Sequence, residues 1–129
     1  MSSVVQTPSP CAFITVLSTG GGGVVMYSPE LYIRQIHEKT VYIYPYFQPA
    51  VGQQLWAQAE ISPYGVAGGM WAPVGVPTMY TSIGLGAQPA ALFALAWEVH
   101  SGYLRIALWD VGVAANTWLV VPILAGKGW

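Results

Sequence analysis

Glycine and proline interrupt this chain at short intervals, and the apolar runs between them have the length of β-strands. The 129 residues include 15 glycines and 10 prolines. Helix interiors tolerate neither residue well, whereas the turns between strands often require them. This pattern predicts an all-β fold, specifically an antiparallel β-sandwich of jelly-roll type.

The length indicates one domain, residues 1–129, which is large enough to bury a core. Residues 1–10 and 125–129 are predicted to be extended arms, because chain ends are often held loosely. Segment 62–89 is rich in glycine and proline and is predicted to be a long loop excursion, with a short strand at 78–83.

Two segments alternate between apolar and polar or aromatic residues, as half-buried strands do. In VYIYPYFQ (41–48) one face carries the tyrosines Tyr42, Tyr44 and Tyr46, and the other face carries Val41, Ile43 and Phe47. Pro45 lacks an amide donor, so this strand is expected at a sheet edge or at a bulge. In QQLWAQAEI (53–61) the inward residues are Leu55, Ala57 and Ala59, and Trp56 faces outward.

Segment 28–39, SPELYIRQIHEK, leaves two interpretations open. Ser28 as an N-cap, Pro29 in the first turn and the spacing of Glu30 and Arg34 indicate a helix. Alternatively, LYIRQI and VYIYPY flank HEKT as two strands flank a four-residue turn. In a chain dominated by strands we favour the hairpin.

The segment LFALAWEVHSGYLRIALWD (92–110) is predicted to be a second hairpin. A three-residue turn with Gly102 in the left-handed conformation would place Trp97 opposite Arg105 and Phe93 opposite Trp109. One face would then be aliphatic and suited to a core. The other would be an aromatic ladder consisting of Phe93, Trp97, Tyr103 and Trp109, with Arg105 among them.

The aromatic ladder is either covered by the same chain or used as a contact surface. Trp, Tyr and Arg dominate the energetics of protein interfaces, which favours a contact surface. The tyrosine strip and Trp56 have the same character. The candidate interface residues are therefore Phe93, Trp97, Tyr103, Arg105, Trp109, Tyr42, Tyr44, Tyr46 and Trp56.

The low charge content supports a covered surface. Charged residues make up 7 % of the chain and the net charge is −1, whereas soluble domains have roughly 25 % charged residues. Such a surface has little charge repulsion to oppose association. We therefore expect much of it to be covered by copies of the same chain or by another protein.

Several functional classes are disfavoured by the sequence. The only histidines are His37 and His100, and the chain has neither GxSxG, HExxH nor a metal-ligand spacing, so neither an enzyme nor a cofactor is expected. The four basic residues are scattered, which argues against nucleic acid as a partner. Prolines and glycines break up the uncharged stretch 61–97, so a membrane-spanning helix is not expected.

These observations predict a non-enzymatic structural subunit that self-assembles or binds a lattice, such as a virion coat or decoration protein or an extracellular filament subunit. Its expected location is a virion or an extracellular assembly. Its expected partners are copies of itself, or another coat or filament protein. The alternative is a lectin-like, glycan-binding module that uses the aromatic side chains as a platform; an amphipathic membrane-active β protein is the third interpretation.

Overall fold

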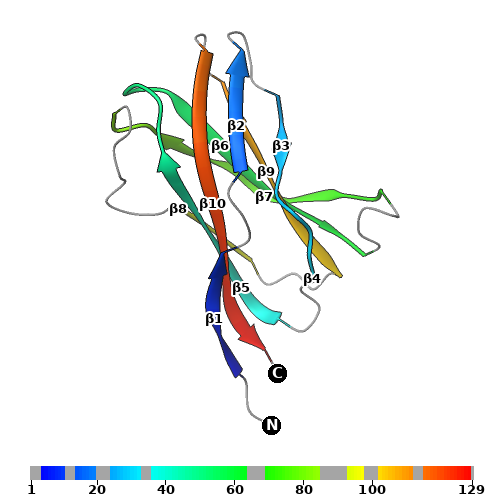
Figure 1. Ribbon diagram of the computed structural model, residues 1–129. Helices are drawn as coiled ribbons and strands as arrows, with labels where there is room; N and C mark the ends of the chain where they lie inside the picture. The colour runs from blue at the N-terminus through cyan, green and yellow to red at the C-terminus, as the bar shows by residue number, and fades with distance from the viewer. Residues whose placement is uncertain are drawn as a thin grey trace.

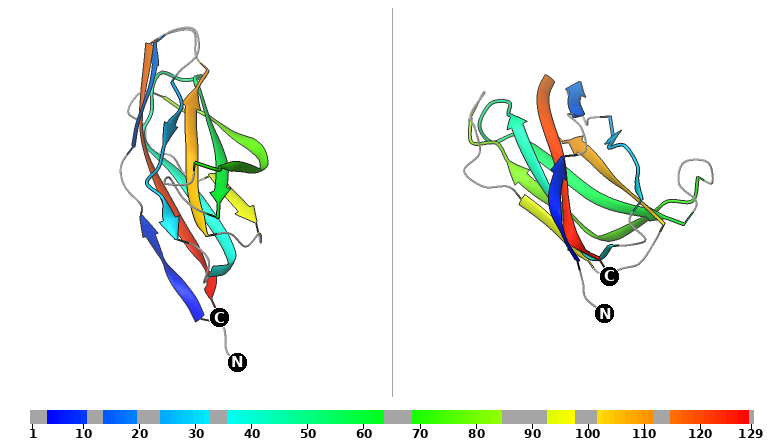
Figure 2. Two further views of the ribbon diagram at one scale, coloured as in Figure 1. Left: turned by 90° about the vertical axis from the view of Figure 1, so that its right-hand side faces the viewer. Right: turned by 60° about the horizontal axis from the view of Figure 1, so that its bottom comes forward.

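The computed structural model describes residues 4–10, 14–19, 24–32, 36–63, 69–84, 93–97, 102–111 and 115–128, and in them the chain is all β. Two antiparallel sheets lie one over the other, an arrangement compatible with a β-sandwich (Figures 1 and 2). The strands are β1 (Val4–Pro10), β2 (Ile14–Thr19), β3 (Met26–Tyr27), β4 (Leu31–Tyr32), β5 (Ile36–Phe47), β6 (Gln54–Ser62), β7 (Ala72–Thr81), β8 (Phe93–Trp97), β9 (Tyr103–Asp110) and β10 (Ala115–Gly128). The all-β, antiparallel prediction is thus confirmed.

Each sheet has five strands. Sheet A has the order β1–β10–β5–β8, and β2 also pairs with β10; sheet B has the order β3–β9–β6–β7, and β4 also pairs with β9. β1 and β2 follow each other along β10, since β1 pairs with residues 123–128 and β2 with residues 115–120. β3 and β4 follow each other along β9 in the same way. The chain therefore passes repeatedly from one sheet to the other.

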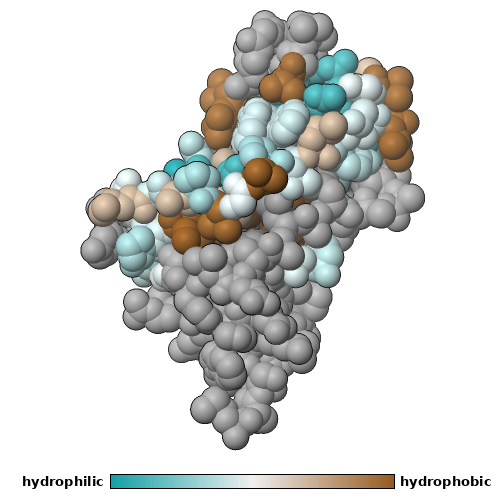
Figure 3. Space-filling model, turned by 180° about the vertical axis from the view of Figure 1, so that it is seen from behind, coloured by the Kyte–Doolittle hydropathy of each residue, from teal (hydrophilic) through white to brown (hydrophobic). Residues whose placement is uncertain are grey.

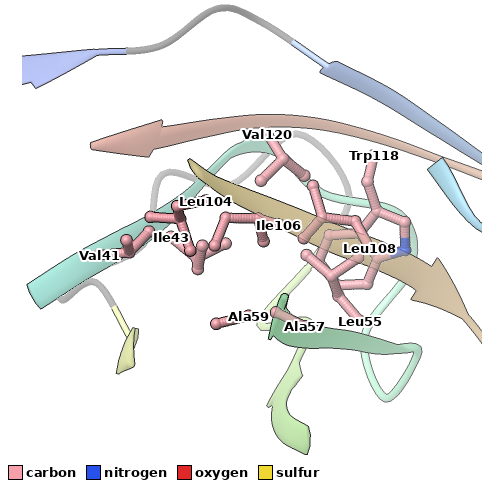
Figure 4. Close-up of a cluster of buried hydrophobic side chains, with 10 residues drawn as sticks. All are labelled: Val41, Ile43, Leu55, Ala57, Ala59, Leu104, Ile106, Leu108, Trp118 and Val120. Carbon is pink, nitrogen blue, oxygen red and sulfur yellow. The ribbon is translucent and has the colours of Figure 1, made fainter. Parts of the chain in front are cut away.

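The hydrophobic core lies between the two sheets (Figure 4). Its buried members are Val41, Ile43, Leu55, Ala57, Ala59, Leu104, Ile106, Leu108, Trp118 and Val120. The predicted inward positions of β6, and Val41 and Ile43 of β5, are all buried. Alternate residues of β9 and β10 complete the core, because every second side chain of a strand points to the same face.

A bulge interrupts β5 at the proline, as the sequence predicts. Phe47 pairs with Leu119 and Pro45 with Val120, so Tyr46 is an extra residue in β5. An extra residue shifts the alternation of faces by one position. Phe47 is consequently 39 % exposed rather than buried beside Val41 and Ile43, and the prediction for this residue is wrong.

The predicted hairpin over 92–110 is also wrong, because its two strands belong to different sheets. β8 pairs with β5, which places Trp97 opposite Lys39 and Phe93 opposite Ile43. β9 pairs with β6, β3 and β4 in sheet B. The connection between β8 and β9 therefore passes from one sheet to the other; residues 98–101 lie outside the described part of the chain.

Gly102 is needed for a close approach rather than for a left-handed turn. Among the described glycines, those with a positive φ are Gly52, Gly69, Gly75 and Gly84. At Gly102 an added Cβ would lie 2.9 Å from the carbonyl oxygen of Pro63, which is backbone and cannot move alone.

We expect Gly102→Ala to lower the free energy of unfolding by about 1–3 kcal/mol, the usual cost of overpacking a buried site. Urea unfolding followed by tryptophan fluorescence measures this difference. Ala substitution of the exposed Thr117 provides a control with a small expected effect. Equal stabilities of the Gly102→Ala variant and the wild type would contradict the close approach.

Segment 28–39 forms neither the favoured hairpin nor the alternative helix. β4 pairs with β9 in sheet B, and β5 begins at Ile36 and runs without a turn through HEKT. Ser28 does not cap a helix: its amide donates to the Ile106 carbonyl (2.9 Å), and its hydroxyl accepts from the Ile106 amide (2.8 Å). The segment is therefore divided between the sheets, with Ser28 and β4 held against β9 in sheet B and β5 paired in sheet A.

The long loop predicted over 62–89 is not confirmed, because β7 occupies residues 72–81; it begins earlier than the predicted strand 78–83 and also ends earlier. Gln58 stabilises an irregularity in β7 by donating from Nε2 to the carbonyls of Val74 (2.8 Å) and Gly75 (3.1 Å). The predicted arms are extended but paired. Val4–Pro10 forms β1 and pairs along β10, which includes residues 125–128.

Candidate interaction surfaces

Arg105 occupies the centre of the outer face of sheet B. Its Nε donates to Glu60 Oε1 at 2.6 Å across β9 and β6. Its guanidinium carbon lies 3.9 Å from the ring centroid of Tyr27 and 4.3 Å from that of Trp71. Arg105 therefore contacts two aromatic rings and a carboxylate that come from three other segments of the chain. Both charged side chains are 19 % exposed.

Two tryptophans form a stacked pair on the same face. Trp56 of β6 lies directly opposite Trp109 of β9, and their rings are 6.5 Å apart and nearly parallel. Met79 lies opposite Trp56 on the β7 side and is 40 % exposed. The indole nitrogen of Trp56 is buried without a hydrogen-bond partner. This pair and Arg105 form one aromatic surface, which we call the sheet B face. Figure 3 views the molecule from that side, and most of the described surface there has intermediate hydropathy.

The tyrosine strip lies on the outer face of sheet A. Tyr42 and Tyr46 are 36 % and 45 % exposed, and the rings of Tyr44 and Tyr46 are 6.1 Å apart. Tyr44 pairs with Val121 and Tyr42 with Ile123 of β10. The tyrosines of β5 thus lie beside aliphatic residues of the neighbouring strand.

The structure separates the predicted interface residues into groups. Trp56, Tyr103, Arg105 and Trp109 come together on sheet B, and Tyr42, Tyr44 and Tyr46 lie on the opposite outer face. Phe93 and Trp97 belong to β8 in sheet A, and their side chains lie outside the described part of the structure. The predicted single ladder is therefore wrong. Its β9 residues face β6 instead of β8.

The sequence analysis missed Tyr27 and Trp71, which enclose Arg105. Tyr27 is in a two-residue strand, and Trp71 immediately precedes β7. Neither position has a periodic pattern that assigns it to a face. The only signal is their residue type, since aromatic rings often stack on arginine.

A buried polar network links the two sheets at one end of the sandwich. Asp110 of β9 is fully buried and accepts a hydrogen bond from the indole N–H of Trp118 in β10. The amide of Asn116 lies 3.4 Å from both Asp110 oxygens and donates to Gln53 Oε1 at 2.8 Å. These bonds run between the sheets, so the network restrains their relative position.

A second set of hydrogen bonds joins the turn between β5 and β6 to the end of β7 and the residues that follow it. Gln48 is fully buried, and its Oε1 accepts from the Tyr80 hydroxyl (3.1 Å) and the Ile83 amide (3.0 Å). Ser82 donates from Oγ to the Pro49 carbonyl at 2.6 Å. Burial raises the pKa of Tyr80 above its ordinary value of 10.0.

The polar groups that a sugar would require on the sheet B face have partners within the chain. The Gln58 amide nitrogen donates to backbone carbonyls of β7, and Glu60 binds Arg105. The described residues contain no cluster of three or more side chains able to hold a metal ion.

The chain matches no family model, no curated protein and no solved structure. In the part of the chain described, no helix has the length and apolar character needed to cross a membrane.

Proposed function

We propose that this protein is a non-enzymatic structural subunit that self-assembles or binds a lattice, such as a virion coat or decoration protein or an extracellular filament subunit. The observation that carries the proposal is the exposure of aromatic and apolar side chains on the sheet B face. Tyr27 and Met79 are exposed and Trp56 and Trp109 are partly exposed, while Arg105 binds Glu60 and lies against two aromatic rings. A surface of this kind favours contact with another protein.

We also propose that the sandwich is a jelly roll. If β1 with β2 and β3 with β4 each count as one interrupted strand, eight strands remain. Their order is 1-8-3-6 in sheet A and 2-7-4-5 in sheet B. This order is that of an eight-stranded jelly roll, a fold that viral capsid and lectin domains share. The strand order thus supports both the proposed function and its alternative.

The proposed partners are copies of the chain or another coat or filament protein. The net charge of −1 supports a position away from nucleic acid, such as the outer shell of a virion or an extracellular assembly. We propose no catalytic role and no cofactor.

Self-assembly predicts a particle mass well above that of one chain. We expect static light scattering of the full chain to give a multiple of 13.8 kDa, or negative-stain microscopy to show particles. Asp substitution of the exposed Met79 on the sheet B face tests that surface directly and is expected to reduce the mass. A monodisperse 13.8 kDa species at high concentration would contradict the proposal.

The second candidate is a glycan-binding module, supported by the stacked Trp56 and Trp109 rings, since sugars bind to aromatic platforms. A bound sugar would quench tryptophan fluorescence, and Trp56→Ala would abolish the quenching. No response to any sugar on a glycan array would rule this candidate out.

A further inference from the structure

Arg105 uses only part of its hydrogen-bonding capacity within the chain. An arginine side chain has five N–H donors on one planar group, one on Nε and four on Nη1 and Nη2. Nε donates to Glu60 Oε1 at 2.6 Å, and in the described part of the chain no residue accepts a hydrogen bond from either Nη atom. The donors of both Nη atoms are therefore available to a ligand.

Both Nη atoms reach the surface. Among the described side chains, the buried polar atom that lacks a partner is the indole nitrogen of Trp56. The Nη atoms also lack a partner but are not buried in this way, so they belong to the 19 % of the Arg105 side chain that is exposed. A ligand can therefore approach them from solvent.

The guanidinium group is held in place before any ligand binds. Glu60 fixes Nε from the neighbouring strand β6, and the rings of Tyr27 and Trp71 lie 3.9 Å and 4.3 Å from the guanidinium carbon. These three contacts restrict a side chain that otherwise has much rotamer freedom, so binding costs less conformational entropy. The rings also exclude water from part of the group, which strengthens its electrostatic interactions.

The geometry and the charge of this site fit a carboxylate. The two Nη atoms of a guanidinium lie side by side and can donate in parallel to the two oxygens of one carboxylate. Glu60 already places a negative charge beside Arg105, so the pair is neutral overall. A phosphate monoester has a charge of about −2 at pH 7, and Glu60 would repel it more strongly than a singly charged carboxylate.

Two observations favour a different protein as the source of this carboxylate. A sugar also needs partners for its hydroxyl groups, and the nearby Gln58 amide already donates to β7 carbonyls. A copy of this chain offers few carboxylates, because it has five acidic residues, of which Asp110 is fully buried and Glu60 binds Arg105. Other soluble proteins have roughly 25 % charged residues and present many more.

We propose that Arg105 binds an aspartate or glutamate side chain of a partner protein, other than a copy of this chain, through its two Nη atoms. This inference rests on the lattice-binding part of the proposed function and names the chemistry of that contact. Arginine, tyrosine and tryptophan are enriched among the few interface residues that contribute most to binding. All three residue types meet at this site.

The test measures binding of the full chain to an immobilised peptide of alternating serine and glutamate by biolayer interferometry. We expect binding that weakens with added salt, and no binding to the matched peptide of serine and glutamine. Arg105→Gln should abolish binding. Arg105→Lys keeps the charge but cannot donate in parallel, so it should weaken binding about tenfold. Lys127→Gln is the matched control, because it removes the same charge from β10 and should bind like the wild type.

The outcomes separate this inference from the proposed function. Equal binding of the acidic peptide by the wild type and Arg105→Gln, or binding by neither, would overturn the inference, while a high mass in light scattering would still support self-assembly. Arg105-dependent binding by a 13.8 kDa monomer would support the inference although self-assembly fails. A lower assembly mass in Arg105→Gln would assign the carboxylate to another copy, and preference for a hyaluronan fragment would assign it to a sugar; either result would overturn the inference.

Discussion

Replacing Trp118 by alanine should lower the free energy of unfolding by about 3–5 kcal/mol, the range for deleting a large buried aromatic side chain. Trp118 is fully buried, and its ring meets Tyr80 edge-on at 6.1 Å. It belongs to β10 in sheet A and contacts residues of sheet B, so its removal leaves a cavity between the sheets. The surrounding side chains can relax only partly into this cavity, so the loss includes the cost of the void as well as the lost burial.

Urea unfolding of the wild type and the Trp118→Ala variant, followed by far-ultraviolet circular dichroism, measures this effect. The neighbouring Thr117 is exposed, so Thr117→Ala serves as the control and should change stability by less than about 0.5 kcal/mol. A loss below about 1 kcal/mol in Trp118→Ala would show that this side chain is not buried between the sheets.

Replacing Asp110 by alanine should lower the free energy of unfolding by about 3 kcal/mol, because a buried donor that loses its acceptor costs roughly 1–3 kcal/mol. The substitution removes the acceptor of the Trp118 indole N–H and of the Asn116 amide. Asp110→Asn keeps one acceptor oxygen in a side chain of the same shape and should be less destabilising.

A double-mutant cycle with Trp118→Phe separates the hydrogen bond from packing. Phenylalanine removes the indole N–H but retains an aromatic ring. If Asp110 and Trp118 interact as the structure shows, the two substitutions together should cost about 1 kcal/mol less than the sum of the single effects. Additive effects would contradict this hydrogen bond.

The strands with regular alternation could be predicted from the sequence with their faces. In β6 the inward Leu55, Ala57 and Ala59 are all buried, and in β5 the tyrosines point outward. The proline signal also located the bulge in β5. The exposure of Phe47 was not predicted, because the faces beyond a bulge can be assigned only when the extra residue has been identified.

The predicted aromatic ladder was assembled with the wrong neighbouring strands. β8 and β9 are rich in apolar residues on both faces and adjacent in sequence, and local rules favour pairing them through a short turn. In the structure each pairs with strands distant in sequence. The turn geometry expected at Gly102 does not occur, because this glycine is packed against Pro63. Short-range patterns cannot include a contact with a neighbouring strand that is distant in the sequence.

The sequence alone determined that the protein is built from antiparallel strands, which residues of the regular strands are buried, and that its surface carries little charge. These properties follow from residue type and from the two-residue period of a strand, and both depend only on residues that are close together in the sequence. Only the tertiary structure decided which strands pair and that Arg105 contacts the rings of Tyr27 and Trp71. Those arrangements depend on strand order, and strand order is set by the burial of both sheets together.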